Sequence, residues 1–198
     1  MCLSTLPHPL RWSPMSTRPA AAPDTAPDFA LSRPTGSVRT QGAVTTFSNT
    51  GSAVTSLERG DVKIVVGALP FDREAPAALT VPEHIIREDG CLQPHAYYRS
   101  GPGSVVHARV SGFDPEPREH LRRIEAAIDT IRESRLDKVV LARAVDFAFD
   151  PPVDPRLVAA RLIDLSQSRD GFMADLSPAG LQGHTIVGSS PELLIRRD

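Results

Sequence analysis

Cysteine is scarce in this sequence of 198 residues, and its two copies, Cys2 and Cys91, lie far apart along the chain. This scarcity argues against a disulfide framework and favours a reducing compartment, so we expect a cytoplasmic protein. It also argues against a structural zinc site. The six histidines show no pairing at metal-ligand spacing.

Long apolar runs and a strong charge of either sign are missing as well. No stretch approaches the roughly 18 continuous apolar residues that a membrane-spanning helix needs. The formal net charge of -2 gives no reason to expect nucleic acid or an anionic membrane as a partner. Walker-type and dinucleotide-binding glycine patterns and the Gly-x-Ser-x-Gly motif are absent. With 40% hydrophobic residues, the chain can still bury one ordinary core.

Prolines recur through residues 1–27, together with the run Ala20-Ala21-Ala22. Frequent prolines block both helix and sheet, so this stretch is predicted to be a disordered Pro/Ala-rich tail. It has no apolar core of the length that a signal peptide needs. A further hypothesis is that Met15 is the true start, which the intact mass of the native protein would test.

Residues 28–198 predict an α+β fold with mainly antiparallel sheets and flanking helices. A hairpin is expected over 29–47, with its turn at Pro34-Thr35-Gly36. The apolar patterns predict further strands over 62–69, 104–110, 171–176 and 184–188, whereas 81–86 is ambiguous. A turn at residues 177–180 is expected to join the last two strands.

Two helices are predicted. The first runs from Asp114 to about Arg135, because its apolar residues recur at spacings of three and four. The second has Asp154 as its N-cap and Pro155 at its first position. The residues of the two apolar stripes are Leu121, Ile124, Ile128 and Ile131 in the first helix and Val158, Leu162 and Leu165 in the second.

Lys138 stands at the head of an apolar run, which predicts a strand from Lys138 to about Phe149. Alternation places Lys138 on a face of small residues, with room for a ligand beside its ammonium group. Arg143 falls on the opposite, core face and would need a partner or an exposed edge. The alternative is that Lys138 is a solvated residue, because lysine is mostly exposed in proteins.

The stretch Gly188-Ser189-Ser190-Pro191-Glu192 is a second candidate site. Ser189 with Glu192 three residues later also matches a capping box at the start of a helix. As a pair, Lys138 and Glu192 suit acid–base chemistry on a small hydroxylated substrate. A lysine base must be neutral and a glutamic acid must hold its proton, and burial favours both uncharged forms. A dry pocket is therefore expected around them.

Three segments, taken together, resemble the chorismate-utilising enzymes, and most closely the isochorismate synthases. They occur in family order and at family-like spacing. They are Val66-Gly67-Ala68-Leu69-Pro70-Phe71-Asp72, Asp137-Lys138-Val139-Val140-Leu141-Ala142-Arg143 and Gly188-Ser189-Ser190-Pro191-Glu192-Leu193-Leu194. The first is characteristic of the isochorismate branch, and the other two are shared more widely. The resemblance places 28–198 in the N-terminal part of a single chorismate-binding catalytic domain.

The resemblance implies a role for each candidate residue. The family's lysine general base, which activates water to attack C2 of chorismate, corresponds to Lys138. The general acid that protonates the departing C4 hydroxyl corresponds to Glu192. Related anthranilate and aminodeoxychorismate synthases carry glutamine in place of Lys138 and use ammonia. Salicylate synthases share the lysine and then eliminate pyruvate, so they remain an alternative.

The resemblance also implies what this chain lacks. In the family, the Mg²⁺ ligands and the basic residues that bind the substrate carboxylates lie in the C-terminal half, so no metal ligand is expected here. We therefore expect the isolated chain to be inactive. The alternative is a non-catalytic remnant, or a subunit that needs a separate C-terminal half. An active enzyme of this type would supply isochorismate for siderophore or menaquinone synthesis.

Overall fold

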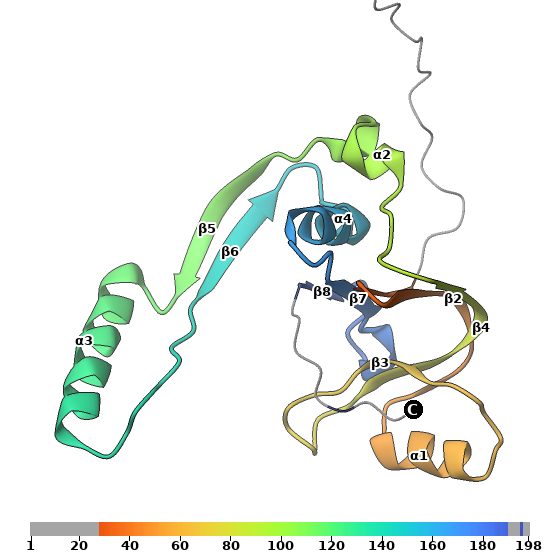
Figure 1. Cartoon of the computed structure of the whole chain (residues 1–198), viewed down its shortest axis with the longest axis horizontal. Coiled ribbons are helices and arrows are strands. Elements are labelled where there is room, and N and C mark those ends of the chain that lie inside the picture. The colour runs from red at the N-terminus through yellow and green to blue at the C-terminus, as the bar shows by residue number, and fades with distance from the viewer. Residues whose placement is uncertain (1–27, 190–194, 196–198) are drawn as a thin grey trace, which may run out of the picture.

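The computed structural model describes residues 28–189 and residue 195. The tail expected over 1–27, the start-site hypothesis for Met15 and the candidate acid Glu192 lie outside the described residues. Figure 1 shows the elements. In chain order they are β1 (Phe29–Arg33), β2 (Gly36–Phe47), α1 (Thr50–Glu58), β3 (Val66–Ala68), β4 (Ala78–Glu88), α2 (Ala96–Arg99), the 3₁₀ turn η1 (Pro102–Ser104), β5 (Ala108–Asp114), α3 (Pro117–Glu133), β6 (Ala144–Phe149), α4 (Pro155–Leu165), β7 (Gly171–Asp175), the 3₁₀ turn η2 (Ser177–Ala179) and β8 (Thr185–Gly188).

Six strands form one sheet in the order β3-β4-β2-β1-β7-β8. Every neighbouring pair in it is antiparallel. β3 contacts β7 although three strands separate them in this order, so the sheet is strongly curled. β5 and β6 form a separate antiparallel pair. The predicted α+β architecture with mainly antiparallel sheets is confirmed.

Several local predictions are confirmed. β1 and β2 form the expected hairpin, in which Phe29 pairs with Thr40 and Arg33 with Gly36. The stretch 81–86, which the sequence pattern does not assign, belongs to β4. Asp154 is the N-cap of α4, because its carboxylate accepts a hydrogen bond from the backbone N–H of Arg156. The turn η2 joins β7 to β8.

The buried face of α4 differs from the prediction. Leu165, expected in the buried stripe, is 82% exposed. The helix instead buries Leu157, Ala159, Ala160 and Ile163. Two of these are alanines, which let the helix axis come close to the sheet. Val158 and Leu162, the other two residues of the predicted stripe, are half-buried. The periodicity of the large residues therefore predicted the helix correctly, but its most buried face lies to one side of the predicted stripe.

The strand predicted over 62–69 contains only β3, Val66–Ala68. Gly67 has a φ of 144°, and a Cβ atom there would overlap the carbonyl oxygen of Ala78 on β4. Only glycine tolerates both this backbone conformation and this close approach. Immediately after β3, the side chains of Leu69 and Phe71 are exposed. The first family-like segment is thus an edge strand followed by an exposed loop.

Buried apolar residues group into three small clusters. One lies between β1, β7 and α4, the second between α1 and β4, and the third between α2 and α4. In that order they contain Ala30, Ala159 and Met173; Ala53, Ala77 and Leu79; and Tyr98, Leu157 and Ala160. All three belong to the six-stranded sheet and the helices that cover it.

Residues 108–149, which comprise β5, α3 and β6, form an arm that leads away from the sheet (Figure 1). The strand predicted over 104–110 lies later, at Ala108–Asp114, because Pro102–Ser104 forms a 3₁₀ turn. The predicted helix over 114–135 is confirmed as Pro117–Glu133, but none of its residues is buried. Among the described residues, no helix combines the length and the apolar character needed to span a membrane.

The N-cap Asp154 links α4 to the short helix α2. Its two carboxylate oxygens lie 2.8 Å from Nε and Nη2 of Arg156, and the hydroxyl of Tyr98 donates to it at 3.2 Å. Burial alone would raise the pKa of Asp154, but hydrogen bonds from Arg156 outweigh it and the pKa lies below its ordinary value. Burial, followed by the charge of Asp154, raises the pKa of Tyr98 to about 12.

We expect Asp154→Ala to lower the free energy of unfolding by about 2 kcal/mol, because it removes the helix cap and leaves the Tyr98 hydroxyl without its partner. Urea denaturation at neutral pH measures this loss. The lowered pKa of Asp154 makes its contribution present above the unfolded-state pKa, near 4, and lost as the pH falls through the folded-state pKa.

The difference between wild type and variant should therefore shrink in acid. Asp61→Ala, which removes an exposed carboxylate, is the control and should change stability by less than about 0.5 kcal/mol. Equal stabilities of wild type and Asp154→Ala at neutral pH would contradict the role of the cap.

Candidate active site

Lys138 lies in the arm, in the segment 136–143 that connects α3 to β6. The strand predicted from Lys138 to Phe149 begins only at Ala144. Pairing of β6 with β5 ends where Ala144 lies opposite Asp114, and beyond that residue β5 gives way to α3. Residues 136–143 therefore have no neighbouring strand among the described residues, and without a neighbour an apolar run cannot form a ladder.

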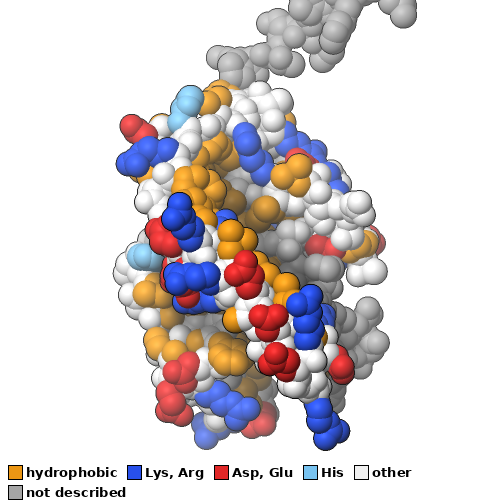
Figure 2. All heavy atoms as spheres, turned by 90° about the vertical axis from the view of Figure 1, so that its left-hand side faces the viewer, with side chains coloured by type: hydrophobic (Ala, Val, Ile, Leu, Met, Phe, Trp, Pro, Cys, Tyr) orange, Lys and Arg blue, Asp and Glu red, His pale blue; other side chains and the backbone are white. Residues whose placement is uncertain are grey.

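The segment nevertheless keeps the predicted alternation. Val139 and Leu141 turn toward α3, where they help to line an open hollow of about 280 Å³ with Ile124, Ile128 and Ile131. Val140, between them, is 79% exposed. Lys138 is exposed too. Figure 2, which views the molecule from the arm side, shows apolar side chains at the surface among the charged ones.

Arg143, expected on the core face, lies on the arm with a partner. Its guanidinium carbon is 5.1 Å from the centre of the Phe113 ring on β5, a distance typical of a cation–π contact. This contact sits at the end of the β5–β6 ladder, next to the pair Asp114 and Ala144. It anchors the C-terminal end of the segment that carries Lys138.

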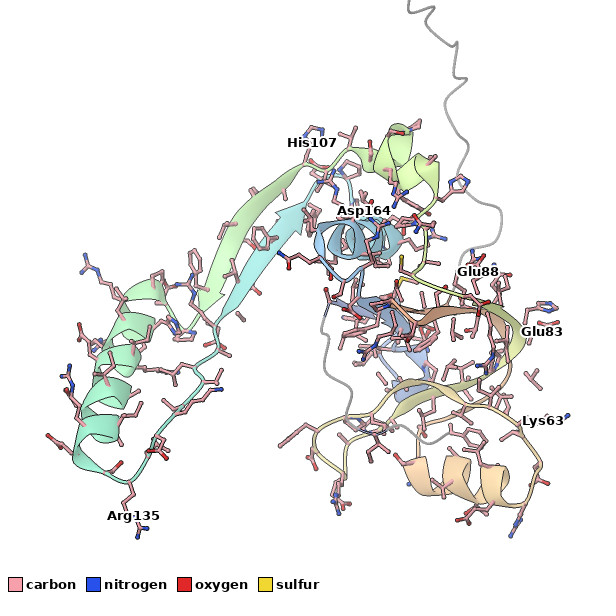
Figure 3. All side chains as sticks on the ribbon, viewed as in Figure 1. Lys63, Glu83, Glu88, His107, Arg135 and Asp164 are labelled. Carbon is pink, nitrogen blue, oxygen red and sulfur yellow. The ribbon has the colours of Figure 1, made fainter. Side chains whose placement is uncertain are left out.

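Lys138 is one of only two lysines in the chain, the other being Lys63. Lys63 lies in the loop between α1 and β3, far from the arm (Figure 3). Lys138 forms no ion pair with any described residue. The dry pocket expected around a lysine base is therefore not built by the described part of the chain, which leaves this side chain exposed.

The second candidate segment begins where β8 ends, at Gly188. A Cβ atom at Gly188 would lie 2.5 Å from the Phe172 ring of β7, so glycine at this position lets the ring pack against the neighbouring strand without shifting. The Ser189 hydroxyl donates a hydrogen bond of 2.9 Å to the carbonyl oxygen of Asp170. Glu192 and its predicted capping box lie outside the described residues. The structure thus positions the start of this segment but does not bring Lys138 and Glu192 together.

A cavity of about 300 Å³ lies elsewhere, against the six-stranded sheet beneath α4. Arg39, His95 and Arg156 contribute polar side chains to it. Sequence reasoning assigned none of them a role, because they come from a strand, a loop and a helix that no local pattern connects. No group of three His, Cys, Asp or Glu side chains that could hold a metal ion is found within residues 28–189.

Comparison with known families places the chain in one of them. Residues 95–198, more than half of the chain, match the family described as chorismate binding enzyme. The chain belongs to this family, which confirms the resemblance. The matched region includes both Lys138 and Glu192, whereas the segment around Gly67 precedes it.

Individual relatives carry a more specific description. The chain is 38% identical over 175 residues to "Putative isochorismate synthase MenF" of Mycobacterium tuberculosis (strain ATCC 25618 / H37Rv), a match that covers 86% of this chain and 45% of that protein. It is 30% identical over 138 residues to isochorismate synthase EntC of Escherichia coli (strain K12), which covers 68% of this chain and 34% of EntC.

The structure also resembles a known one. The crystal structure of DhbC from Bacillus anthracis aligns with a TM-score of 0.63 at 23% identity, over 87% of this chain and 46% of DhbC. At this identity the likeness is one of fold. The chain spans less than half the length of the curated relatives it matches.

Proposed function

We propose that this chain supplies the acid–base residues of an isochorismate synthase. Lys138 takes a proton from water as the water oxygen bonds to C2 of chorismate. The ring double bonds shift, the bond from C4 to its hydroxyl breaks, and Glu192 gives a proton to the departing hydroxyl. The observation that supports this is the family match over 95–198, which includes both residues. We place the reaction in the cytoplasm, in keeping with the scarcity of cysteine.

The arrangement of the arm supports a role for Lys138 at a surface that another part of the enzyme covers. Val139 and Leu141 face α3, so the alternating residues Lys138 and Val140 point away from it. An unpaired apolar segment is also an edge on which a further strand can pair. A strand or loop placed there would bury the ammonium group and favour its neutral, basic form.

Burial is what favours the basic form of a lysine, and Lys138 is exposed among the described residues. We therefore propose that the 198-residue chain alone does not convert chorismate. We expect turnover when the part of a relative that follows the aligned region is joined to this chain. Magnesium dependence belongs to the proposal through the family resemblance. The described residues do not form a magnesium site, and the steps given above use only side chains of this chain.

A hybrid enzyme tests the proposal. Residues 28–198 of this chain are joined to the part of Escherichia coli EntC that follows the aligned region. Chorismate and Mg²⁺ are added, and the products are separated by chromatography. We expect the hybrid to form isochorismate without releasing pyruvate, and the isolated chain and the isolated EntC part each to form none.

Intact EntC is the positive control, and cooperative thermal unfolding shows whether the hybrid is folded. Salicylate with pyruvate as products would assign the chain to the salicylate synthases instead. A folded hybrid that leaves chorismate unchanged would contradict the proposed function. Turnover by the 198-residue chain alone would contradict the proposal that this chain by itself does not convert chorismate.

A further inference from the structure

The cavity beneath α4 is created by the register of three strands. Arg39 of β2 lies directly opposite Ala30 of β1, and Ala30 lies directly opposite Met173 of β7. Directly opposed residues point to the same face of an antiparallel sheet, so these three side chains form one row across it. Ala30 is the smallest of the three and leaves a gap between the guanidinium of Arg39 and the side chain of Met173.

The helix above does not fill this gap. α4 presents Ala159, Ala160 and Ile163 to the cavity. Ala159 packs against Ala30 and Met173. Because an alanine side chain ends at Cβ, the two alanines leave the space beside this contact open. The result is a slot between sheet and helix, with a volume of about 300 Å³. That volume lies at the lower end of the range for small-molecule sites.

The charged side chains that line the cavity are all basic. Arg39 and Arg156 line it, and no aspartate or glutamate is among its lining residues. Arg156 is held by both oxygens of Asp154, so its charge is largely balanced. Arg39 makes one hydrogen bond, of 3.0 Å, to Glu88. Its Nε is buried and has no hydrogen-bond partner among the described residues.

Arg39 is therefore the group in the cavity that still has a hydrogen-bond donor available for a ligand. The Glu88 side chain is 51% exposed and lies at the end of β4 (Figure 3). Surface ion pairs of this kind contribute little stability, so a ligand anion can compete with Glu88 for the guanidinium. A buried donor without a partner calls for a physical explanation, and an anion bound beside it provides one.

We propose that this cavity binds a small carboxylic acid with an apolar ring, about the size of benzoate. The carboxylate pairs with the guanidinium of Arg39, whose planar fork suits a carboxylate. The ring lies in the slot beside Ala30, between Met173 and Ile163. The site is independent of the proposed function, because none of the residues that line it belongs to the segment 136–143.

Binding of benzoate to the folded 198-residue chain, measured by ligand-observed NMR titration, tests the site. We expect a dissociation constant of about 1 mM or below. Benzamide has the same ring without the charge and should bind at least about 10-fold more weakly, as should benzoate to Arg39→Gln. Acetate, which has the charge without the ring, should bind at least about 10-fold more weakly than benzoate.

The matched control is Arg87→Gln, which removes the same charge from the neighbouring strand β4 at an exposed position that does not line the cavity. It should leave benzoate binding unchanged. A folded wild-type chain that does not bind benzoate would overturn the proposal. Equal affinity of Arg39→Gln and wild type would overturn the assignment of Arg39, and equal affinity for acetate would overturn the role of the ring.

A second variant tests the position of the ring. Ala30→Leu extends a side chain into the gap between Arg39 and Met173, so it should abolish benzoate binding while thermal unfolding remains cooperative. Unchanged affinity in folded Ala30→Leu would show that the ligand lies elsewhere and would overturn the proposed geometry. If this variant fails to fold, the comparison of Arg39→Gln with Arg87→Gln still shows whether Arg39 binds the carboxylate.

Discussion

Lys138→Gln in the EntC hybrid should slow isochorismate formation by about 10²- to 10⁴-fold, the range that a positioned general base contributes. An amide of similar length preserves the shape of the side chain but cannot take a proton from water. Because the residue is exposed in the arm and forms no ion pair with a described residue, its replacement should not disturb the fold. The loss should appear in kcat, with KM for chorismate little changed.

Lys63→Gln is the matched control for this experiment. It removes the only other lysine of the chain, and that lysine is exposed in the loop between α1 and β3. The control should keep the turnover of the unmodified hybrid. If Lys138→Gln also kept near-normal turnover, Lys138 would be removed from the mechanism and would be the solvated surface residue that lysine usually is.

Glu192→Gln should reduce turnover by a similar factor, about 10²- to 10⁴-fold. An amide cannot protonate the departing C4 hydroxyl, and hydroxide is a poor leaving group without that proton. The substitution also separates the two hypotheses for this residue. Glutamine serves as well as glutamate in a capping box, so a residue that only caps a helix would tolerate the change.

Steady-state kinetics of the folded hybrid measures the effect of Glu192→Gln, and circular dichroism checks that its helix content is retained. The control is Glu125→Gln, which makes the same change at an exposed position on α3. Retained turnover in Glu192→Gln with an intact fold would support the capping role and contradict the acid. A loss in Glu125→Gln as large as that in Glu192→Gln would show that the assay reports stability and not chemistry.

Local signals predicted the elements whose hydrogen bonds are themselves local. The hairpin of β1 and β2 and the N-cap of α4 by Asp154 were both predicted, because a turn or a cap depends on residues a few positions apart. The buried face of α4 was not predicted. Which side of a helix is buried depends on the surface it meets, and here that surface favours Ala159 and Ala160 over Leu165.

Lys138 illustrates the same limit at the candidate site. Its apolar run has the composition of a strand and keeps the alternation of one, with Val139 and Leu141 turned toward α3. It lacks a neighbouring strand among the described residues, since β5 ends opposite Ala144. The composition of a segment can favour extended backbone, but a ladder needs a second chain segment at the right distance.

Sequence alone determined the family, the antiparallel α+β architecture and the two residues proposed for proton transfer, because these depend on residue types and their order. Only the tertiary structure decided that Lys138 is exposed on a projecting arm and that Arg39, Ala30 and Met173 line one row of a cavity. Burial and strand register arise between segments far apart in the chain, and no pattern within either segment encodes them.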